Sequence, residues 1–211
     1  MTGSGTKGRP ERGFVAMAAA VSPAALWAAA ATDSDSVRTI LRDSSLPDLA
    51  GEAARNLVDH CALRDRALAV IGSGWATSAM LDLESKIVEA GLGHVVVHEA
   101  KDFSHGRFMS VAGTRAISGG VLHIGVGSLG LYEEQLLHTL GKYIDIQSLR
   151  SQEVGVLGAL DVLHACQRFA VHYGRHQGVD ISQPGDPPSD FLSLYRWTSG
   201  LGGEGSGVFD V

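Results

Sequence analysis

The sequence predicts an α/β protein built on an open parallel sheet that helices cover on both faces. Two observations lead to this prediction. Short apolar runs alternate with helical patterns through the middle of the chain, which is typical of a sheet wound from strand–helix–strand units. One of these runs, Ala67-Leu-Ala-Val-Ile71, is apolar at every position, as expected for a central strand between two helix layers. With 45% hydrophobic and 19% charged residues, the 211-residue chain can bury a substantial core.

The N-terminal region is expected to lie outside that sheet. Residues 1–12 combine small polar and charged residues with a proline, which indicates a flexible start. The Ala-rich stretch 13–31 predicts one or two close-packed helices that break near Ser22-Pro23. Because basic residues precede it, this stretch also imitates a secretory signal. Its alanine content and Pro23 favour a buried helix instead.

The elements of the sheet follow in order. Residues 48–63 predict an amphipathic helix with Leu49, Ala53, Leu57 and Cys61 on one face. After the strand at 67–71, a helix over 76–90 stops at Gly91, a residue that favours helix ends. The remaining predicted elements are strands at 93–97 and 121–126, a helix at 133–140, a short strand at 143–146 and a helix at 154–172. The region from residue 174 onward reads as loop.

Charge and cysteine content exclude several classes of protein. The chain has 17 Lys and Arg against 23 Asp and Glu, which gives a formal net charge of −6. It therefore lacks the positive electrostatic field that attracts nucleic acid, and a general nucleic-acid binder is disfavoured. Cys61 and Cys166 are far apart and have no CxxC partner, which disfavours a disulfide scaffold or a cysteine zinc site. Cys166 falls on the apolar stripe of the last helix and is predicted to be a core residue. His172 and His176 are spaced i, i+4 but lack a third metal ligand, so no metal site is predicted.

The first candidate site is the turn between the buried strand and the next helix. Gly72, Ser73 and Gly74 open this turn, and Thr77 and Ser78 follow at the helix start. Glycines allow close approach of a ligand to the backbone amides, and hydroxyls add donors, so the turn could hold an anion. It lacks the third glycine of a dinucleotide fingerprint and the lysine of a phosphate-binding P-loop. A plain strand–helix turn is an equally good interpretation.

A second set of residues has side chains that are suited to proton transfer. Lys86 and Glu89 are spaced i, i+3 on one helix face, so their side-chain ends can meet. The segment Ser104-His-Gly-Arg107 follows a predicted strand, where α/β folds place ligand-binding groups. A histidine exchanges protons near neutral pH and a carboxylate can move a proton between adjacent carbons. A solvated salt-bridged face remains the alternative interpretation for Lys86 and Glu89.

These motifs resemble the SIS (sugar isomerase) domain family, which includes the isomerase half of glucosamine-6-phosphate synthase. Lys86-Ile-Val-Glu89 is similar to the family's helix motif, and Asp102-Phe-Ser-His105-Gly106 is similar to its acidic and His-Gly loop. The ending Gly178-Val-Asp-Ile-Ser-Gln-Pro184 resembles that of a bacterial double-SIS subgroup, with Ile181 in place of the usual proline. The resemblance covers roughly residues 50–197. It implies a three-layer α/β/α fold with a flavodoxin-like parallel sheet.

The resemblance also implies roles for individual residues. Glu89 would move a proton between C1 and C2 of an open-chain sugar, and Lys86 would orient it or stabilise charge. His105 would assist ring opening, and in the synthase this histidine comes from the neighbouring subunit. Gly72, Ser73, Gly74, Thr77 and Ser78 would bind the substrate. No cofactor or metal is implied.

The chain departs from the family pattern in its first part. The resemblance implies a flexible start and the helical remnant of a preceding SIS domain over 1–47, the SIS domain over 48–197 and a Gly-rich tail over 198–211. No Ser/Thr-rich phosphate loop precedes Ala67, the equivalent Val126–Gly130 turn is poor in hydroxyls, and no lysine follows Lys142.

Two functions are therefore predicted as alternatives. The first is a cytoplasmic binder of a phosphosugar or carbohydrate derivative, with aldose–ketose isomerisation if it is active. The second is a non-catalytic sugar-sensing or dimerisation subunit that completes a partner SIS chain. Both imply a homodimer or a complex with another SIS-containing chain, and neither implies contact with a membrane or with nucleic acid.

Overall fold

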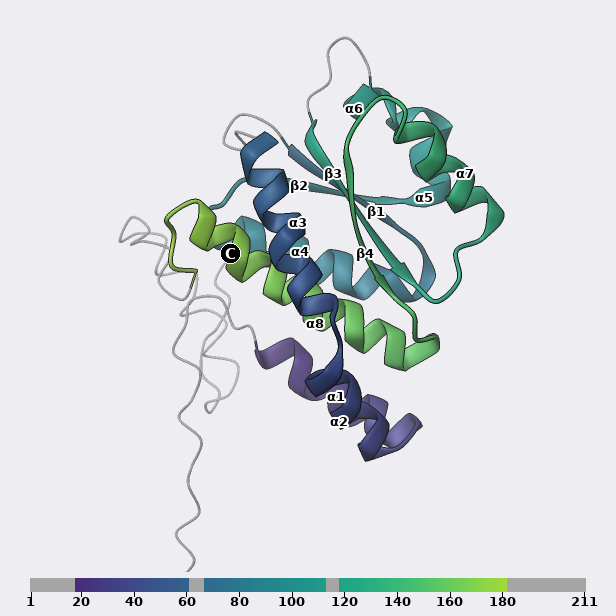
Figure 1. Cartoon of the computed structure of the whole chain (residues 1–211), viewed down its shortest axis with the longest axis vertical. Coiled ribbons are helices and arrows are strands. Elements are labelled where there is room, and N and C mark those ends of the chain that lie inside the picture. The colour runs from purple at the N-terminus through teal and green to yellow at the C-terminus, as the bar shows by residue number, and fades with distance from the viewer. Residues whose placement is uncertain (1–17, 61–66, 113–117, 182–211) are drawn as a thin grey trace, which may run out of the picture.

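Four parallel strands form one sheet in the order β2-β1-β3-β4, which is the order that begins a flavodoxin-like sheet (Figure 1). The computed structural model of the chain describes residues 18–60, 67–112 and 118–181. In β1 and β2, Ala67 pairs with His94 and the register continues to Gly72 and Glu99. The strands are β1 (Ala67–Gly72), β2 (His94–Glu99), β3 (Ser118–Val126) and β4 (Ile146–Ser151).

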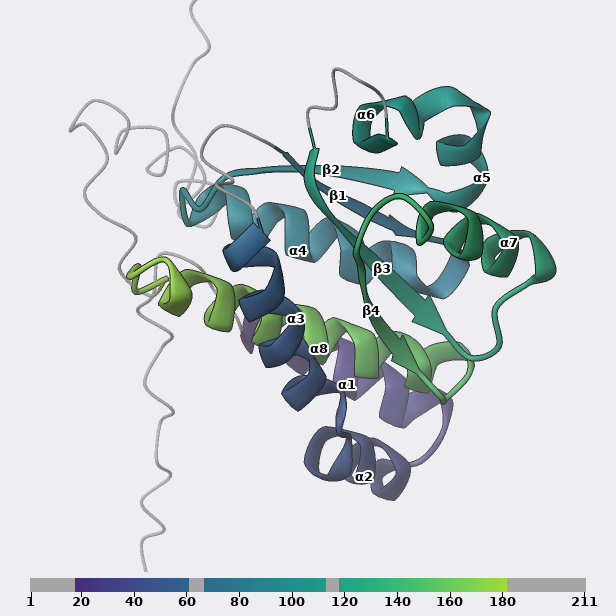
Figure 2. The same ribbon diagram turned by 45° about the horizontal axis from the view of Figure 1, so that its top comes forward.

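Helices cover both faces of this sheet, so the predicted three-layer α/β/α fold is confirmed (Figure 2). One layer consists of α3 (Leu46–His60), α4 (Thr77–Glu89) and α8 (Gly155–His176). The other consists of α5 (Ala100–Asp102), the π-type turn η2 (Phe103–Arg107), α6 (Met109–Ala112) and α7 (Leu131–Leu140). A short 3-10 turn, η1 (Gly74–Ala76), leads from β1 into α4.

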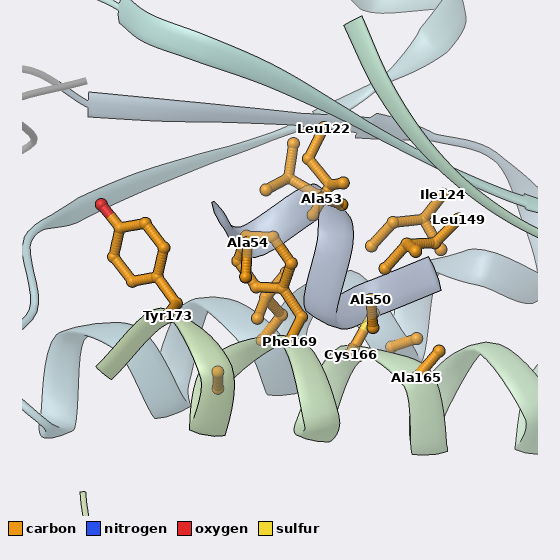
Figure 3. Close-up of a cluster of buried hydrophobic side chains, with 14 of the residues drawn as sticks. Ala50, Ala53, Ala54, Leu122, Ile124, Leu149, Ala165, Cys166, Phe169 and Tyr173 are labelled. Carbon is orange, nitrogen blue, oxygen red and sulfur yellow. The ribbon is translucent and has the colours of Figure 1, made fainter. Parts of the chain in front are cut away.

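The larger apolar core lies between the sheet and α3, α4 and α8 (Figure 3). Leu122, Ile124 and Leu149 reach into it from the strands, and the stacked rings of Phe169 and Tyr173 fill it from α8. On α3 the buried positions facing this core include the small residues Ala50, Ala53 and Ala54, which let α3 approach α8 closely. Cys166 is fully buried there, and burial raises the pKa of its thiol, as expected for the predicted core residue.

A smaller apolar core lies on the opposite face of the sheet. Ala69, Ile71 and Val121 project from the strands, and Phe103 and Leu140 cover them from η2 and α7. All of the apolar positions of β1 are buried or half-buried on one face or the other. This is the behaviour predicted from the continuous apolar run at 67–71.

The helices α1 (Ala18–Ala31) and α2 (Ser34–Asp43) lie beyond α8, outside the three layers (Figure 1). Ala28 and Val37 pack with Leu160 of α8 in a separate small cluster. The expected break at Ser22-Pro23 is not observed, because α1 runs through Pro23 without interruption. A single proline removes one backbone hydrogen bond, and the surrounding alanines are the strongest helix formers. That these residues belong to a preceding SIS domain remains a prediction.

Three further sequence-based expectations need correction. Leu49 is 45% exposed, and the buried stripe of α3 uses Ala50 in its place. The fourth strand begins at Ile146 rather than Tyr143, because residues 141–144 form the turn that closes α7. The Ser104–Arg107 segment, expected as a loop, belongs to a chain of short helical turns over 100–112, with Phe103 buried beneath it.

Some expectations concern residues outside the described ranges. These are the flexible start at 1–12, Cys61 on the α3 stripe, and the tail, including Pro184 and 198–211. Within the described part of the chain, no helix has both the length and the apolar character that a bilayer span requires.

Gly72 sets how closely β1 and β3 pack at their carboxyl ends. A Cβ at this position would overlap with the carbonyl oxygen of Ile124. We expect Gly72→Ala to lower the free energy of unfolding by about 1–3 kcal/mol, because the two strands must separate to admit the methyl group. Urea denaturation of the purified chain measures this change.

Gly130→Ala is the matched control for this substitution. Gly130 has an ordinary negative φ of −70°, and a methyl group added there would meet no atom within 4 Å. Equal stability losses for the two variants would contradict the close approach of β1 and β3.

Candidate functional site

The predicted ligand turn lies at the carboxyl end of β1, where parallel α/β sheets bind their ligands. Gly72 is buried, Ser73 is half-buried, and Gly74, Thr77 and Ser78 are exposed. Gly74 adopts a φ of +58°, which favours glycine. The amides of Ala76 and Thr77 already donate to the carbonyls of Ser73 and Gly74, so fewer amides are free for an anion than the sequence suggested.

Lys86 does not pair with Glu89. It is buried in the α4–α8 contact, and its Nζ lies 3.5 Å from Oδ1 of Asp82, one helical turn earlier. The other Asp82 oxygen accepts a hydrogen bond of 3.3 Å from Gln167 of α8. This Asp-to-Lys order at i, i+4 suits the helix geometry, and α8 completes the cluster.

Glu89 is exposed at the last residue of α4 and accepts a hydrogen bond from Ser85. His105 is exposed on η2, where the backbone bends at Gly106 with a φ of +119°. Helix α4 and η2 lie on opposite faces of the sheet (Figure 2). A single chain therefore does not bring Lys86, Glu89 and His105 together as one catalytic group.

An open pocket of about 540 Å³ lies between η2–α6 and α7. Three aromatic side chains, Phe108, Tyr132 and Tyr143, line it together with the uncharged polar residues Ser104, Gln135 and Thr139. Its remaining lining residues are Ala112, Leu136 and Leu140. Aromatic faces carry negative charge density and attract the polarised C–H bonds of a ligand, while the amide and hydroxyls orient its polar groups.

A buried histidine holds α7, which forms one wall of this pocket. His123 of β3 is completely buried, with its Nδ1 2.9 Å from Oγ of Ser148 on β4 and its Nε2 3.1 Å from Oε1 of Glu133 on α7. The hydroxyl of Tyr132 also lies 3.5 Å from the carbonyl oxygen of Lys101. These polar contacts tie α7 to the sheet and to α5.

This pocket was not predicted from the sequence. Its aromatic residues are distributed between two segments, 104–112 and 132–143, that are separated by the whole of β3. Only 6% of the residues of the chain are aromatic, so the aromatic residues of these two segments stand out in the sequence. Nothing in the sequence indicated that the two segments face each other across the same layer.

Within 18–60, 67–112 and 118–181, no group of three or more His, Cys, Asp or Glu side chains is arranged to hold a metal ion. His172 packs its ring against Gly51 of α3, and burial and then nearby arginines lower its pKa.

The fold and pocket define a three-layer α/β/α protein with a candidate small-molecule site on one helix layer. No family model and no curated protein matches the sequence. A solved structure from Salmonella typhimurium LT2, named "Putative sugar binding protein", is similar over 66% of this chain, with 15% identity and a TM-score of 0.51. The match covers 45% of that structure, so this chain spans less than half its length. At this level of identity the similarity shows a shared fold.

The role of His123 can be tested with adjacent glutamates of α7. We expect Glu133→Ala to lower the free energy of unfolding by about 1–3 kcal/mol, because it leaves a buried imidazole nitrogen without a partner. Urea denaturation measures this loss, and hydrogen exchange measures the faster opening of α7.

Glu134→Ala is the control, since Glu134 is exposed and lies in the same first turn of α7. It removes the same charge from the helix N-terminus but leaves His123 paired. Equal losses in both variants would show that the helix dipole, and not His123, accounts for the effect.

Proposed function

We propose that this protein binds a carbohydrate derivative in the aromatic pocket between η2–α6 and α7. The observation that carries the proposal is the lining of that pocket, with Phe108, Tyr132 and Tyr143 beside Ser104, Gln135 and Thr139. A sugar ring has apolar C–H faces that suit aromatic rings and hydroxyls that suit amide and hydroxyl groups. The pocket volume of about 540 Å³ is within the range of small-molecule sites.

Two further observations support the same ligand class. The fold is shared with a structure whose name includes sugar binding. The His105-Gly106 motif, on which the resemblance to the SIS family partly rests, lies in η2 between two residues that line the pocket, Ser104 and Phe108.

Binding can be tested with aromatic substitutions. We expect a screen of hexoses, N-acetylhexosamines and hexose phosphates to raise the melting temperature of the intact chain for at least one class. Calorimetry on that ligand should show roughly threefold to tenfold weaker binding for Tyr132→Ala and for Phe108→Ala, since each loses one stacking contact.

Trp27→Ala is the control, because Trp27 is also an exposed aromatic residue but lies on the remote helix α1. Ser78→Ala tests the predicted turn at the carboxyl end of β1. Loss of binding in Ser78→Ala with full binding in both aromatic variants would move the site to that turn and overturn the pocket assignment.

Isomerisation is a second candidate function, and it requires two copies of the chain. Glu89 and His105 occupy opposite faces of the sheet, as they would if each active site took its histidine from a neighbouring subunit. In this proposal Glu89 releases Ser85 to accept the C2 proton of an open-chain sugar phosphate, and His105 of the second copy assists ring opening.

Proton exchange in deuterium oxide tests this candidate. We expect deuterium at C2 of the sugar phosphate with the unmodified chain and none with Glu89→Gln or with His105→Asn. After subunit exchange, a mixture of the two variants should recover about one quarter of the activity, because half of the dimers regain one intact site. Absence of exchange with the unmodified chain would exclude isomerisation and leave carbohydrate binding as the only proposed function.

A further inference from the structure

Basic side chains gather on the C-terminal half of α8 and on the neighbouring helix α3. We call this group the basic patch, and its members are Arg55, Arg168, His172, Arg175 and His176. The four members on α8 are spaced i, i+4, i+7 and i+8, so they follow one side of the helix over about 12 Å. The ring of His172 packs against α3, because a Cβ at Gly51 would lie only 3.4 Å from two of its atoms. Arg55 is one helical turn beyond Gly51 and therefore belongs to the same surface.

The positive charge of the basic patch is not balanced within the described part of the chain. Arg55, Arg168 and Arg175 are exposed, and no described carboxylate lies within ion-pair distance of them. Burial, and then the charges of the other four members of the patch, lower the pKa of the half-buried His172, and no described carboxylate offsets them. The electrostatic potential at this ring is therefore positive, in a chain whose formal net charge is −6.

The dipole of α8 accounts for only part of the basic patch. Cations in the last turn of a helix interact favourably with its C-terminal carbonyl groups, which explains Arg175 and His176. Arg168 lies about two turns before the end of α8, where this effect has faded, and Arg55 belongs to another helix. Like charges on neighbouring turns repel each other, so these arginines do not stabilise the single chain through one another. Their grouping therefore favours a role in binding an anionic partner.

We propose that the basic patch docks an acidic helical segment of a partner protein. Carboxylates that recur every three or four residues on such a helix match the i, i+4, i+7 spacing of the patch along α8. Guanidinium groups pair with carboxylates through two parallel hydrogen bonds, and exposed charges of opposite sign guide the two surfaces together. Arg55 on α3 adds a second row of charge, which fixes the side of α8 on which the segment lies.

The extent and position of the patch favour this kind of partner. The patch is longer than a single small anion, and none of its members lines the aromatic pocket or the smaller pocket of about 330 Å³ over Ala69 and His98. Nucleic acids and anionic membranes carry negative charge far beyond the edges of such a patch, where the acidic remainder of the chain repels them. Because α3 and α8 cover the opposite face of the sheet from the aromatic pocket, the proposal is independent of carbohydrate binding.

Fluorescence anisotropy with the intact chain and a model peptide tests the proposal. The probe is a labelled helical peptide with a glutamate at every third or fourth position, and its control is the same peptide with glutamine at those positions. We expect saturable binding of the glutamate peptide and none of the glutamine peptide. Added salt should weaken the binding, because the paired charges are exposed to solvent.

Substitutions of single arginines locate the binding surface. Arg55→Gln, Arg168→Gln and Arg175→Gln should each weaken binding of the glutamate peptide by roughly twofold to fivefold, the usual effect of one exposed ion pair. A triple variant should bind more than about tenfold more weakly, because the three contacts are distributed over two helices. Arg38→Gln is the matched control, since it removes the same charge from an exposed arginine of α2 that already pairs with Asp35. It should leave binding unchanged.

Two further measurements separate docking from a role in the fold. Arg168→Gln should keep or raise the melting temperature, because it removes repulsion and breaks no ion pair among the described residues. Titration of the histidine signals by NMR should show a higher pKa of His172 in the complex, since nearby carboxylates favour its charged form. The signals of His172 are identified by their loss in His172→Gln.

Several results would overturn the proposal. One is the absence of peptide binding at millimolar concentration, and another is equal binding by the unmodified chain and the triple variant. A marked fall in the melting temperature of Arg168→Gln would show that this arginine serves the fold instead. Tighter binding of a single-stranded oligonucleotide of equal charge, or of phosphatidylserine vesicles, would assign the patch to a different polyanion. A dimer of the unmodified chain that dissociates in the triple variant would assign it to a second copy.

Discussion

His123 brings a polar ring into the apolar layer between the sheet and α7, and both of its nitrogens need partners there. A buried polar atom without a partner costs about 1–3 kcal/mol, which is large beside the net stability of a domain. Ser148 on the neighbouring strand and Glu133 in the first turn of α7 supply these partners from two directions. Because hydrogen bonds are directional, they restrict how α7 lies over β3 and β4. The position of α7 determines where Tyr132, Gln135 and Thr139 stand, so the aromatic pocket depends on this histidine.

The opposite wall of that pocket is anchored differently. Phe103 is completely buried in the smaller apolar core, and the backbone after it bends at Gly106, where the positive φ favours glycine. The short turns on either side of this bend direct alternate side chains to opposite sides. Ser104 and Phe108 line the aromatic pocket, while Arg107 and Ser110 line the pocket above His98. One bent segment therefore contributes lining residues to both pockets, although it consists only of short helical turns.

The central elements could be predicted from sequence because their signals are local. The apolar run at 67–71 and the helix that stops at Gly91 need no knowledge of distant residues. The partner of Lys86 could not be predicted from the local sequence, because both Asp82 and Glu89 lie within reach of Lys86 along α4. Gln167 of α8 binds Asp82 and burial excludes water from the contact, so the packing of α8 decides between them. His123 shows the same limit, since its partners Ser148 and Glu133 come from segments that only the tertiary fold brings next to it.

Binding and isomerisation make different demands on these side chains. A binding pocket needs shape and polar groups that can reach a ligand, and Ser104, Gln135 and Thr139 line the pocket beside Phe108 and Tyr132. Isomerisation also needs a free base and an acid at one reacting carbon. In the single chain Lys86 is paired with Asp82, Glu89 accepts a hydrogen bond from Ser85, and His105 lies on the other face of the sheet. Bringing Glu89 and His105 to one substrate therefore requires a second chain, whereas ligand binding at η2 requires only the residues of one.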